Sequence, residues 1–393
     1  MKTRHWFVGV VLAAGAVLAV ALSVRQFMTQ NQKPLHPDLG KISAVVDAEP
    51  SPKWAAAVKR SRMIARQGLA QQNVPGLSVA VGAGGELVWA EGFGWADLES
   101  QTPVTPESRF RIGHVSKSLT SAAVGRLVDQ GRLRLDDEIQ DYVPAYPKKD
   151  WPVTLRQLMG HLAGVRHYRD DEWGDKPTVH CDRASDGVQS FANDRLLFEP
   201  ETKYSYSTYG WVLVSAAVEA AAGEPFAQVM RAQVFDPIGM SHTRADAPKE
   251  QIPNRVTSYF RGNFEQVLTT GVDYSCFAGG GAFLSTPSDL VRFGITIADG
   301  KFLQPATLRR LQTRQELKSG EATSYGLGWM LDTAELAGER TPMVGHSSRM
   351  MEGASDSFWM FPERGLVVAV TSNMSFADMR SLALAIAGEF AKK

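Results

Sequence analysis

Apolar side chains near the start of the folded region follow first a helical and then a strand pattern. Residues 53–72 place them at helical spacing, and the Asn-Val-Pro-Gly run at 73–76 predicts the end of that helix. Residues 77–81 alternate apolar and small side chains, and residues 86–90 repeat an apolar run after the glycine-rich turn 82–85. This arrangement predicts a helix followed by a β-hairpin.

The C-terminal end has the same two kinds of element in reverse order. Residues 357–361 and 366–370 are apolar runs separated by the turn sequence 362–365, which predicts a second hairpin. A final helix is predicted from an apolar stripe at spacings of three and four, formed by Phe376, Met379, Ala383, Ile386 and Phe390. Because each stripe needs a sheet to cover it, both chain ends are expected to build one layer.

The middle of the chain is predominantly helical in its pattern. Residues 119–130 and 210–222 are helix candidates, each followed by a glycine that predicts the helix end. The predicted fold class is therefore α+β: an antiparallel β-sheet flanked by the N- and C-terminal helices, with an inserted mainly helical lobe. We assign 53–113 and 311–393 to the α/β lobe and 114–310 to the helical lobe, with a cleft between them.

The first 52 residues differ in character from the rest. Basic Lys2 and Arg4 precede an apolar run from Phe7 to Val24, which is typical of an export signal. Residues 1–25 can be a signal peptide cleaved near Ala21-Leu22-Ser23 or an uncleaved signal anchor, and the length of the run favours the anchor. Residues 26–52 are polar and rich in proline, which predicts a flexible linker before the folded domain 53–393.

The charge balance, the cysteine count and the lack of cofactor motifs exclude several classes of function. The 393 residues include 42 basic and 42 acidic side chains, so no net field attracts nucleic acid or another polyanion. The two cysteines, Cys181 and Cys276, can pair in an oxidising compartment or remain isolated buried thiols, and sequence leaves both possibilities open. No nucleotide fingerprint and no zinc-binding His-Glu-x-x-His motif is found, so we expect no metal, no nucleotide and no other cofactor.

The first chemical motif lies where a loop enters a helix. The stretch Phe110-Arg111-Ile112-Gly113-His114-Val115-Ser116-Lys117 resembles the serine β-lactamase and penicillin-binding-protein family, whose Ser-x-x-Lys motif supplies an acyl-accepting serine and a lysine base. Aligned on these flanks, the family serine falls on His114. No lysine of the chain has a serine three positions before it, so no second copy of the motif exists.

The second motif points to one branch of that family. Tyr206-Ser207-Thr208 resembles the Tyr-Ser-Thr of the branch that includes mitochondrial LACTB. The resemblance makes Tyr206 a proton relay and Thr208 a substrate-binding residue. A phenol acts as a base only when cations stabilise its anion, and Lys117 and His346 are the neighbours that the family implies.

The third motif is altered as well. Val344-Gly345-His346-Ser347-Ser348-Arg349 stands where relatives of the class C type carry His-Thr/Ser-Gly on a strand that lines the cleft. The resemblance makes His346 a site residue, and Ser347, Ser348 and Arg349 substrate-binding residues. It also implies an oxyanion hole formed by the backbone N–H groups of residues 114 and 349. Ser348 and Arg349 replace glycine, so side chains stand where bare backbone admits the substrate.

The resemblance covers residues 53–390, and three functions compete. The chain can be a non-catalytic cleft binder of a peptide or peptidoglycan-like ligand, an acyl hydrolase acting on amides or esters, or a filament-forming scaffold like one member of the LACTB branch. Loss of the serine and of the third-motif glycines favours the binder.

Expected catalytic positions are His114, Lys117, Tyr206 and His346. A bacterial periplasmic or other extracytoplasmic location is expected, with the N-terminal helix as the membrane contact and a homo-oligomer as a possible assembly.

Overall fold

The computed structural model describes residues 33–47, 50–169, 172, 179–262, 266–268, 273–350 and 353–392. The strands are β1 (Ala44–Val46), β2 (Gly76–Ala83), β3 (Glu86–Asp97), β4 (Thr102–Pro103), β5 (Phe110–Arg111), β6 (Arg244–Ala245), β7 (Tyr259–Arg261), β8 (Gln266–Leu268), β9 (Phe283–Ser285), β10 (Met330–Leu336), β11 (Glu339–Met350), β12 (Ala354–Phe361) and β13 (Leu366–Ser372). The α-helices are α2 (Ala55–Gln71), α3 (Ser116–Asp129), α4 (Leu155–Met159), α5 (Ala184–Val188), α6 (Thr208–Ala222), α7 (Phe226–Met230), α8 (Asp236–Ile238), α9 (Pro287–Ala298), α10 (Pro305–Leu311) and α11 (Met379–Ala391). Short helical turns are η1 (Leu39–Lys41), η2 (Gly113–Val115), η3 (Ile139–Asp141), η5 (Arg231–Phe235), η6 (Ser275–Gly280) and η7 (Pro362–Arg364).

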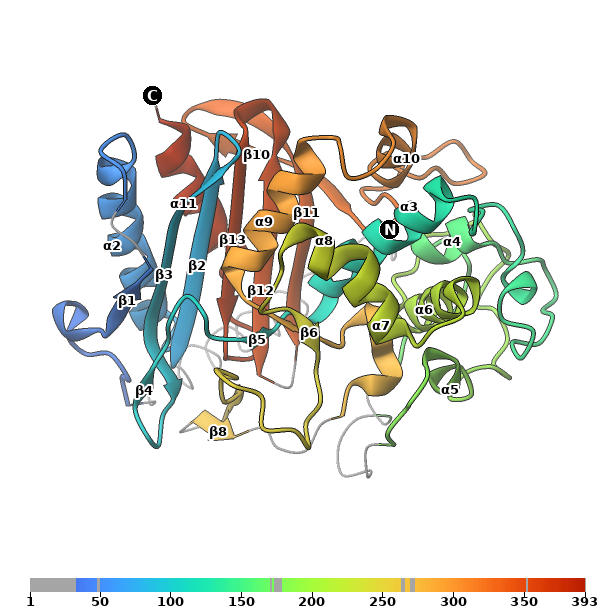
Figure 1. Cartoon of the computed structure of the whole chain (residues 1–393), viewed down its shortest axis with the longest axis horizontal. Helices are drawn as coiled ribbons and strands as arrows, with labels where there is room; N and C mark the ends of the chain where they lie inside the picture. The colour runs from blue at the N-terminus through green and yellow to red at the C-terminus, as the bar shows by residue number, and fades with distance from the viewer. Residues whose placement is uncertain are drawn as a thin grey trace, which may run out of the picture.

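One antiparallel sheet dominates the α/β lobe (Figure 1). Its strand order is β1-β3-β2-β13-β12-β11-β10, with β4 added beside β3, so strands from both chain ends lie next to each other. The N-terminal hairpin turns at Gly84 and Gly85, whose φ angles of 63° and 86° favour glycine. The predicted antiparallel sheet and its two hairpins are thus confirmed.

Helices cover both faces of this sheet. The helices α2 and α11 pack together on one face, and their stripes bury Val58, Ala65, Leu69, Ile386 and Phe390. The helix α9 lies across the other face, against β2 and β13. Residues 287–298 therefore lie on the sheet, although they fall within the range 114–310 predicted for the helical lobe. The boundaries of the two lobes stay a prediction.

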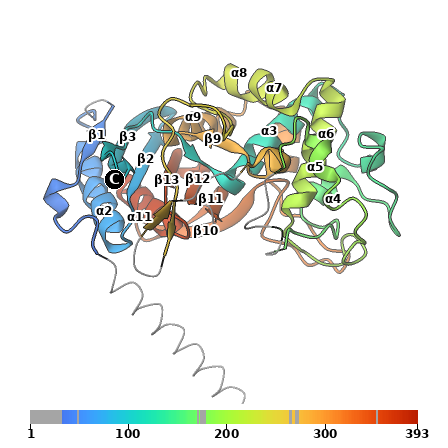
Figure 2. The ribbon, with the colours of Figure 1, turned by 90° about the horizontal axis from the view of Figure 1, so that it is seen from below.

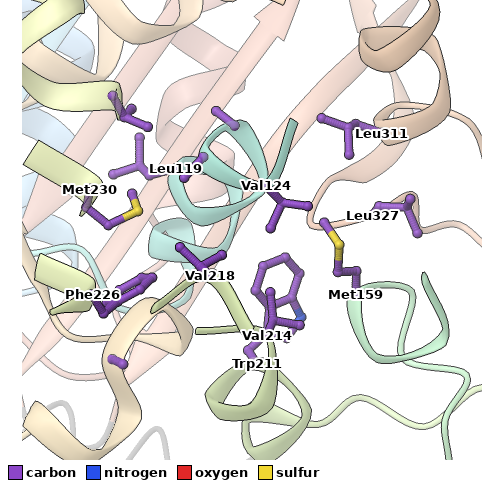
Figure 3. Close-up of a cluster of buried hydrophobic side chains, with 14 of the residues drawn as sticks. Leu119, Val124, Met159, Trp211, Val214, Val218, Phe226, Met230, Leu311 and Leu327 are labelled. Carbon is purple, nitrogen blue, oxygen red and sulfur yellow. The ribbon is translucent and has the colours of Figure 1, made fainter. Parts of the chain in front are cut away.

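The helical lobe lies beside the sheet (Figures 1 and 2), and its dense core is continuous with buried side chains of α9, β12 and β13. Figure 3 shows side chains of α3 and α6 in this core, including Leu119, Val124, Trp211 and Val214. Trp211 is fully buried between these helices and neighbouring loops. Ser207 caps α6 by accepting the Gly210 N–H, and Gly223 ends the helix at φ 71°. The lobe thus fixes the start of α3 and the start of α6 relative to each other.

Two predictions about local structure are wrong. The sequence predicts a flexible linker over 26–52, yet within it β1 pairs with β3, and the His36 ring hydrogen-bonds to the carbonyls of Val74 and Pro75. The segment is ordered because β1 adds to the edge of the sheet beside β3, where pairing satisfies backbone groups of both strands. The sequence predicts Phe376 within the last helical stripe, but it precedes α11, has φ 57° and is 49% exposed.

The N-terminal signal falls outside the described residues, so the prediction for residues 1–25 is not addressed. Within the ranges described above, no helix has both the length and the apolar character that crossing a bilayer requires.

A disulfide joins Cys181 to Cys276, with a Cα–Cα distance of 4.9 Å. The sequence left open whether these cysteines pair or remain isolated thiols, and the structure shows that they pair. The bond links chain segments 95 residues apart, and closing so long a loop contributes about 2–5 kcal/mol to stability. It also anchors η6, whose backbone carbonyls reach the candidate site.

Candidate active site

The first motif forms a tight turn at the entrance to a helix. His114 lies in η2, and α3 begins two residues later, so His114 precedes the α-helix rather than starting it. Gly113 has φ 42°, and a Cβ at this position would collide with Ser348 Oγ. Glycine is therefore required here both by conformation and by the close approach of β11.

Lys117 is completely buried one turn after His114. Its Nζ donates to the Gly280 carbonyl at 2.8 Å and to Thr208 Oγ1 at 3.4 Å. The same nitrogen stands 4.9 Å from the centre of the Tyr206 ring. Burial lowers the pKa of the Lys117 amine well below its usual value, because the charged form loses its water.

The second motif runs directly into α6. Thr208 Oγ1 lies 3.5 Å from His114 Nε2, so the threonine touches both residues of the first motif. The Tyr206 ring lies 5.4 Å from the His114 ring, between centres. Burial raises the pKa of Tyr206 well above 10, and Lys117 approaches the ring face rather than stabilising a phenolate. The phenol is therefore held protonated, which disagrees with the expectation that it works as an anionic base.

The third motif occupies β11 in the predicted position. His346 faces the first two motifs, with its ring 6.5 Å from the His114 ring and 6.4 Å from the Tyr206 ring. Its Nδ1 lies 2.9 Å from the Ser347 carbonyl, and its Nε2 lies 2.9 Å from the Tyr325 hydroxyl. The N–H therefore belongs on Nδ1, and Nε2 accepts the Tyr325 proton. Burial and the nearby Lys117 lower the pKa of His346 to about 3.

Only alternate residues of β11 face this cluster. Ser348 does so, because side chains two apart share a face of a strand. Ser347 points the other way and meets Ser357, while Arg349 forms an ion pair with Asp378 at the start of α11. The expectation that Ser347 and Arg349 bind substrate with their side chains is thus not supported, since both lie across the strand from His346.

Ser348 contacts the turn that carries the first motif. Its Oγ accepts the backbone N–H of His114 at 3.1 Å, and its side chain is buried. This N–H is one of the two groups expected to form an oxyanion hole. The Ser348 hydroxyl accepts from this N–H, so the donor is already engaged.

Three further residues complete the cluster, and none was assigned a role from sequence. His161 lies against Tyr206 at 4.2 Å and against Tyr325 at 4.6 Å, between ring centres. Its Nδ1 accepts the Ser207 N–H, and His167 Nδ1 accepts the Thr208 N–H, each at 3.1 Å. These imidazoles therefore hold the second motif in place by its backbone. His161 has φ 61°, an unusual conformation for a residue with a side chain.

The imidazoles of the cluster are held in their neutral form. Burial, followed by repulsion from Lys117, lowers the pKa of His114 and of His161 well below 6.5. The same two causes lower the pKa of His167 to about 4. Only His114, His167 and Tyr206 in this group keep partial exposure. Among the residues that the structure describes, no group of three or more His, Cys, Asp or Glu side chains is placed to hold a metal ion.

An antiparallel sheet with helices on both faces, a helical lobe, and three motifs meeting between them define the fold of penicillin-binding proteins and serine β-lactamases. The family described as Beta-lactamase matches residues 62–389, and the chain belongs to that family. The expected family and fold are thereby confirmed.

Similar proteins come from animals, bacteria and archaea. The mitochondrial serine beta-lactamase-like protein LACTB of Homo sapiens is 27% identical, over 86% of this chain and 80% of its own. Penicillin-binding protein 4* of Bacillus subtilis is 26% identical, over 69% of this chain and 62% of its own. The solved structure of an octameric penicillin-binding protein homologue from Pyrococcus abyssi superposes with a TM-score of 0.72 at 24% identity, covering 83% of this chain and 76% of its own.

Proposed function

We propose that this protein is a non-catalytic member of its family that binds a peptide or peptidoglycan-like ligand at the cluster. The observation that carries the proposal is the hydrogen bond from the His114 N–H to Ser348 Oγ. Acyl transfer needs a nucleophile and a free oxyanion donor. Here the serine is replaced by an imidazole, and the donor at residue 114 is engaged.

The state of the lysine supports the same proposal. The Lys117 amine donates a hydrogen bond to the Gly280 carbonyl and lies near Thr208, and the side chain at position 114 has no hydroxyl that it can deprotonate. The lowered pKa leaves it able to accept a proton, yet position 114 supplies no acidic partner. The parts of a hydrolase therefore remain as a packed polar cluster without its reactive oxygen.

The polar groups of the cluster suit a neutral amide better than a charged group. Tyr206 Oη and His161 Nε2 are buried and have no hydrogen-bond partner among the described residues. Buried polar atoms of this kind normally bind a water or a ligand. Because both side chains are neutral, they can donate to the carbonyl of a peptide bond. Similarity to proteins named penicillin-binding protein and D-aminopeptidase supports a peptide ligand.

The disulfide supports an extracytoplasmic or otherwise oxidising location, since such bonds persist where thiols are not kept reduced. Residues 1–25 would then act as a signal peptide or anchor. A homo-oligomer remains part of the proposal, given the similarity to the octameric Pyrococcus abyssi homologue.

Ligand binding is tested by titrating the protein with a soluble muropeptide ending in D-alanine, monitored by calorimetry, and by mass analysis of the recovered peptide. We expect saturable binding and an intact peptide. Tyr206→Phe should weaken binding roughly 2–10-fold, the value of one hydrogen bond. Tyr204→Phe is the matched control, because Tyr204 is 41% exposed beside the cluster. Cleaved peptide, or equal affinity for both variants and the natural protein, would refute the proposal.

A further inference from the structure

A row of polar side chains crosses one of the two buried faces of the sheet, next to the candidate site. Ser348 on β11 pairs with Asp356 on β12, Asp356 pairs with Thr371 on β13, and Thr371 pairs with Ser78 on β2. Residues paired across neighbouring strands project to the same face, with Cβ atoms about 4.5–5.5 Å apart. The row therefore lies on the face that carries His346 and Ser348.

Asp356 is the unusual member of this row. Its side chain is 1% exposed, and within the described part of the chain neither carboxyl oxygen has a hydrogen-bond partner. An unpaired carboxylate in a protein core is destabilising by several kcal/mol, so buried acids are normally paired, protonated or bound to a cation. A proton would remove the charge, but the resulting O–H and C=O would still need partners.

Two hydroxyl groups in the same row also lack hydrogen-bond partners. Thr371 Oγ1 and Ser78 Oγ are fully buried and also lack a partner among the described residues. Ser348 Oγ accepts from the His114 N–H and retains a further lone pair. A carboxylate with hydroxyl oxygens on both sides is an oxygen-only donor set, which hard cations prefer over nitrogen or sulfur ligands.

We infer that Asp356, Ser348 and Thr371 form a binding site for a small monovalent cation of the Na⁺ class, with Ser78 holding a coordinated water. A monovalent ion fits the charge of the site, because the row contains one carboxylate and no second acid to balance a divalent ion. Neighbouring strands are about 4.7–4.9 Å apart. Oxygen ligands of Ca²⁺, an ion of similar radius to Na⁺, lie about 2.3–2.6 Å from the metal. An ion between adjacent strands can therefore reach oxygens from both.

The site would connect the sheet to the first motif. A cation bound to Ser348 Oγ fixes that hydroxyl where it accepts the His114 N–H. Loss of the ion should loosen η2, which packs against β11 and β12. The inference does not rest on the proposed ligand-binding function, since it concerns the sheet and would hold for a hydrolase as well.

The test compares the melting temperature of the whole protein in NaCl and in choline chloride at equal ionic strength. We expect the melting temperature to rise with the logarithm of the Na⁺ concentration, because an ion bound only by the folded state stabilises it by mass action. Asp356→Asn keeps the shape of the side chain and should abolish the difference between the two salts. Asp182→Asn, at an exposed acid, should preserve it.

A second variant separates a cation from a proton. Thr371→Val removes one ligand and keeps the carboxylate, so it should shift the Na⁺ dependence at least about 10-fold in concentration, the usual effect of disturbing a metal site. If the row is dry and Asp356 is protonated, Thr371→Val instead removes an unsatisfied hydroxyl and stabilises the protein in both salts. That result, or identical melting in both salts for the natural protein, would overturn the inference. Thr371→Val decides the question even if Asp356→Asn does not fold.

Discussion

His114→Ser combined with Ser348→Ala should restore covalent labelling by a fluorescent penicillin or a fluorophosphonate. The first change places a hydroxyl one helical turn before Lys117, whose pKa is lowered by burial so that the amine can take the proton. The second frees the His114 N–H from Ser348 Oγ. Loss of a nucleophile lowers turnover by about 10⁶-fold in a serine hydrolase, so the gain in labelling should be large.

The single variants show how much each substitution contributes to the gain in labelling. His114→Ser alone keeps the oxyanion donor engaged, and removal of one such donor costs about 10²–10³ in rate. We therefore expect the double variant to label about 10²–10³ times faster than His114→Ser. Lys117→Ala added to the double variant should abolish labelling, and near-ultraviolet circular dichroism should verify that each variant is folded. Equal labelling rates for the single and double variants would show that Ser348 does not block the donor.

Acid should destabilise this protein steeply through its buried histidines. An unfolded histidine takes up a proton near pH 6.5, whereas His346 in the folded chain does so at about 3 and His167 at about 4. Between these values the unfolded state binds more protons, so the free energy of unfolding falls as the pH falls. Each such histidine contributes a slope of about 1.4 kcal/mol per pH unit. Lys117 acts in the same direction over a higher pH window, because its pKa is also lowered.

Urea denaturation between pH about 6.5 and about 4 measures this slope. His346→Gln should reduce the slope by about 1.4 kcal/mol per pH unit, whatever its effect on stability at neutral pH. His242→Gln, outside the cluster, is the control and should leave the slope unchanged. A His346→Gln variant with the full slope of the natural protein would mean that His346 is not held neutral by its surroundings.

The fold could be predicted in large part because its signals are local. The two hairpins follow from alternation and from turn residues such as Gly84 and Gly85, and the structure places all of these strands in one sheet. The alternation of side chains along β11 also bears on the third motif. Ser347 and Arg349 are each one residue removed from the face of His346 and Ser348, so a two-residue period alone would have separated the two pairs.

The rest of the site depends on contacts between distant segments. Tyr325 hydrogen-bonds His346 from an irregular segment just before β10, and no local motif marks it. His161 stood in a family-like stretch, but only the structure brings it against Tyr206 and the backbone of Ser207. Asp356 carried a readable signal, since an acid near the start of a strand that continues into an apolar run predicts either exposure or a partner.

Intact-mass analysis of the natural protein after incubation with penicillin and with a fluorophosphonate shows whether the cluster holds a reactive nucleophile. We expect an unchanged mass with both reagents, because position 114 lacks a hydroxyl and its N–H is hydrogen-bonded to Ser348. A stoichiometric adduct on the natural chain, mapped to any residue of the cluster, would contradict this expectation.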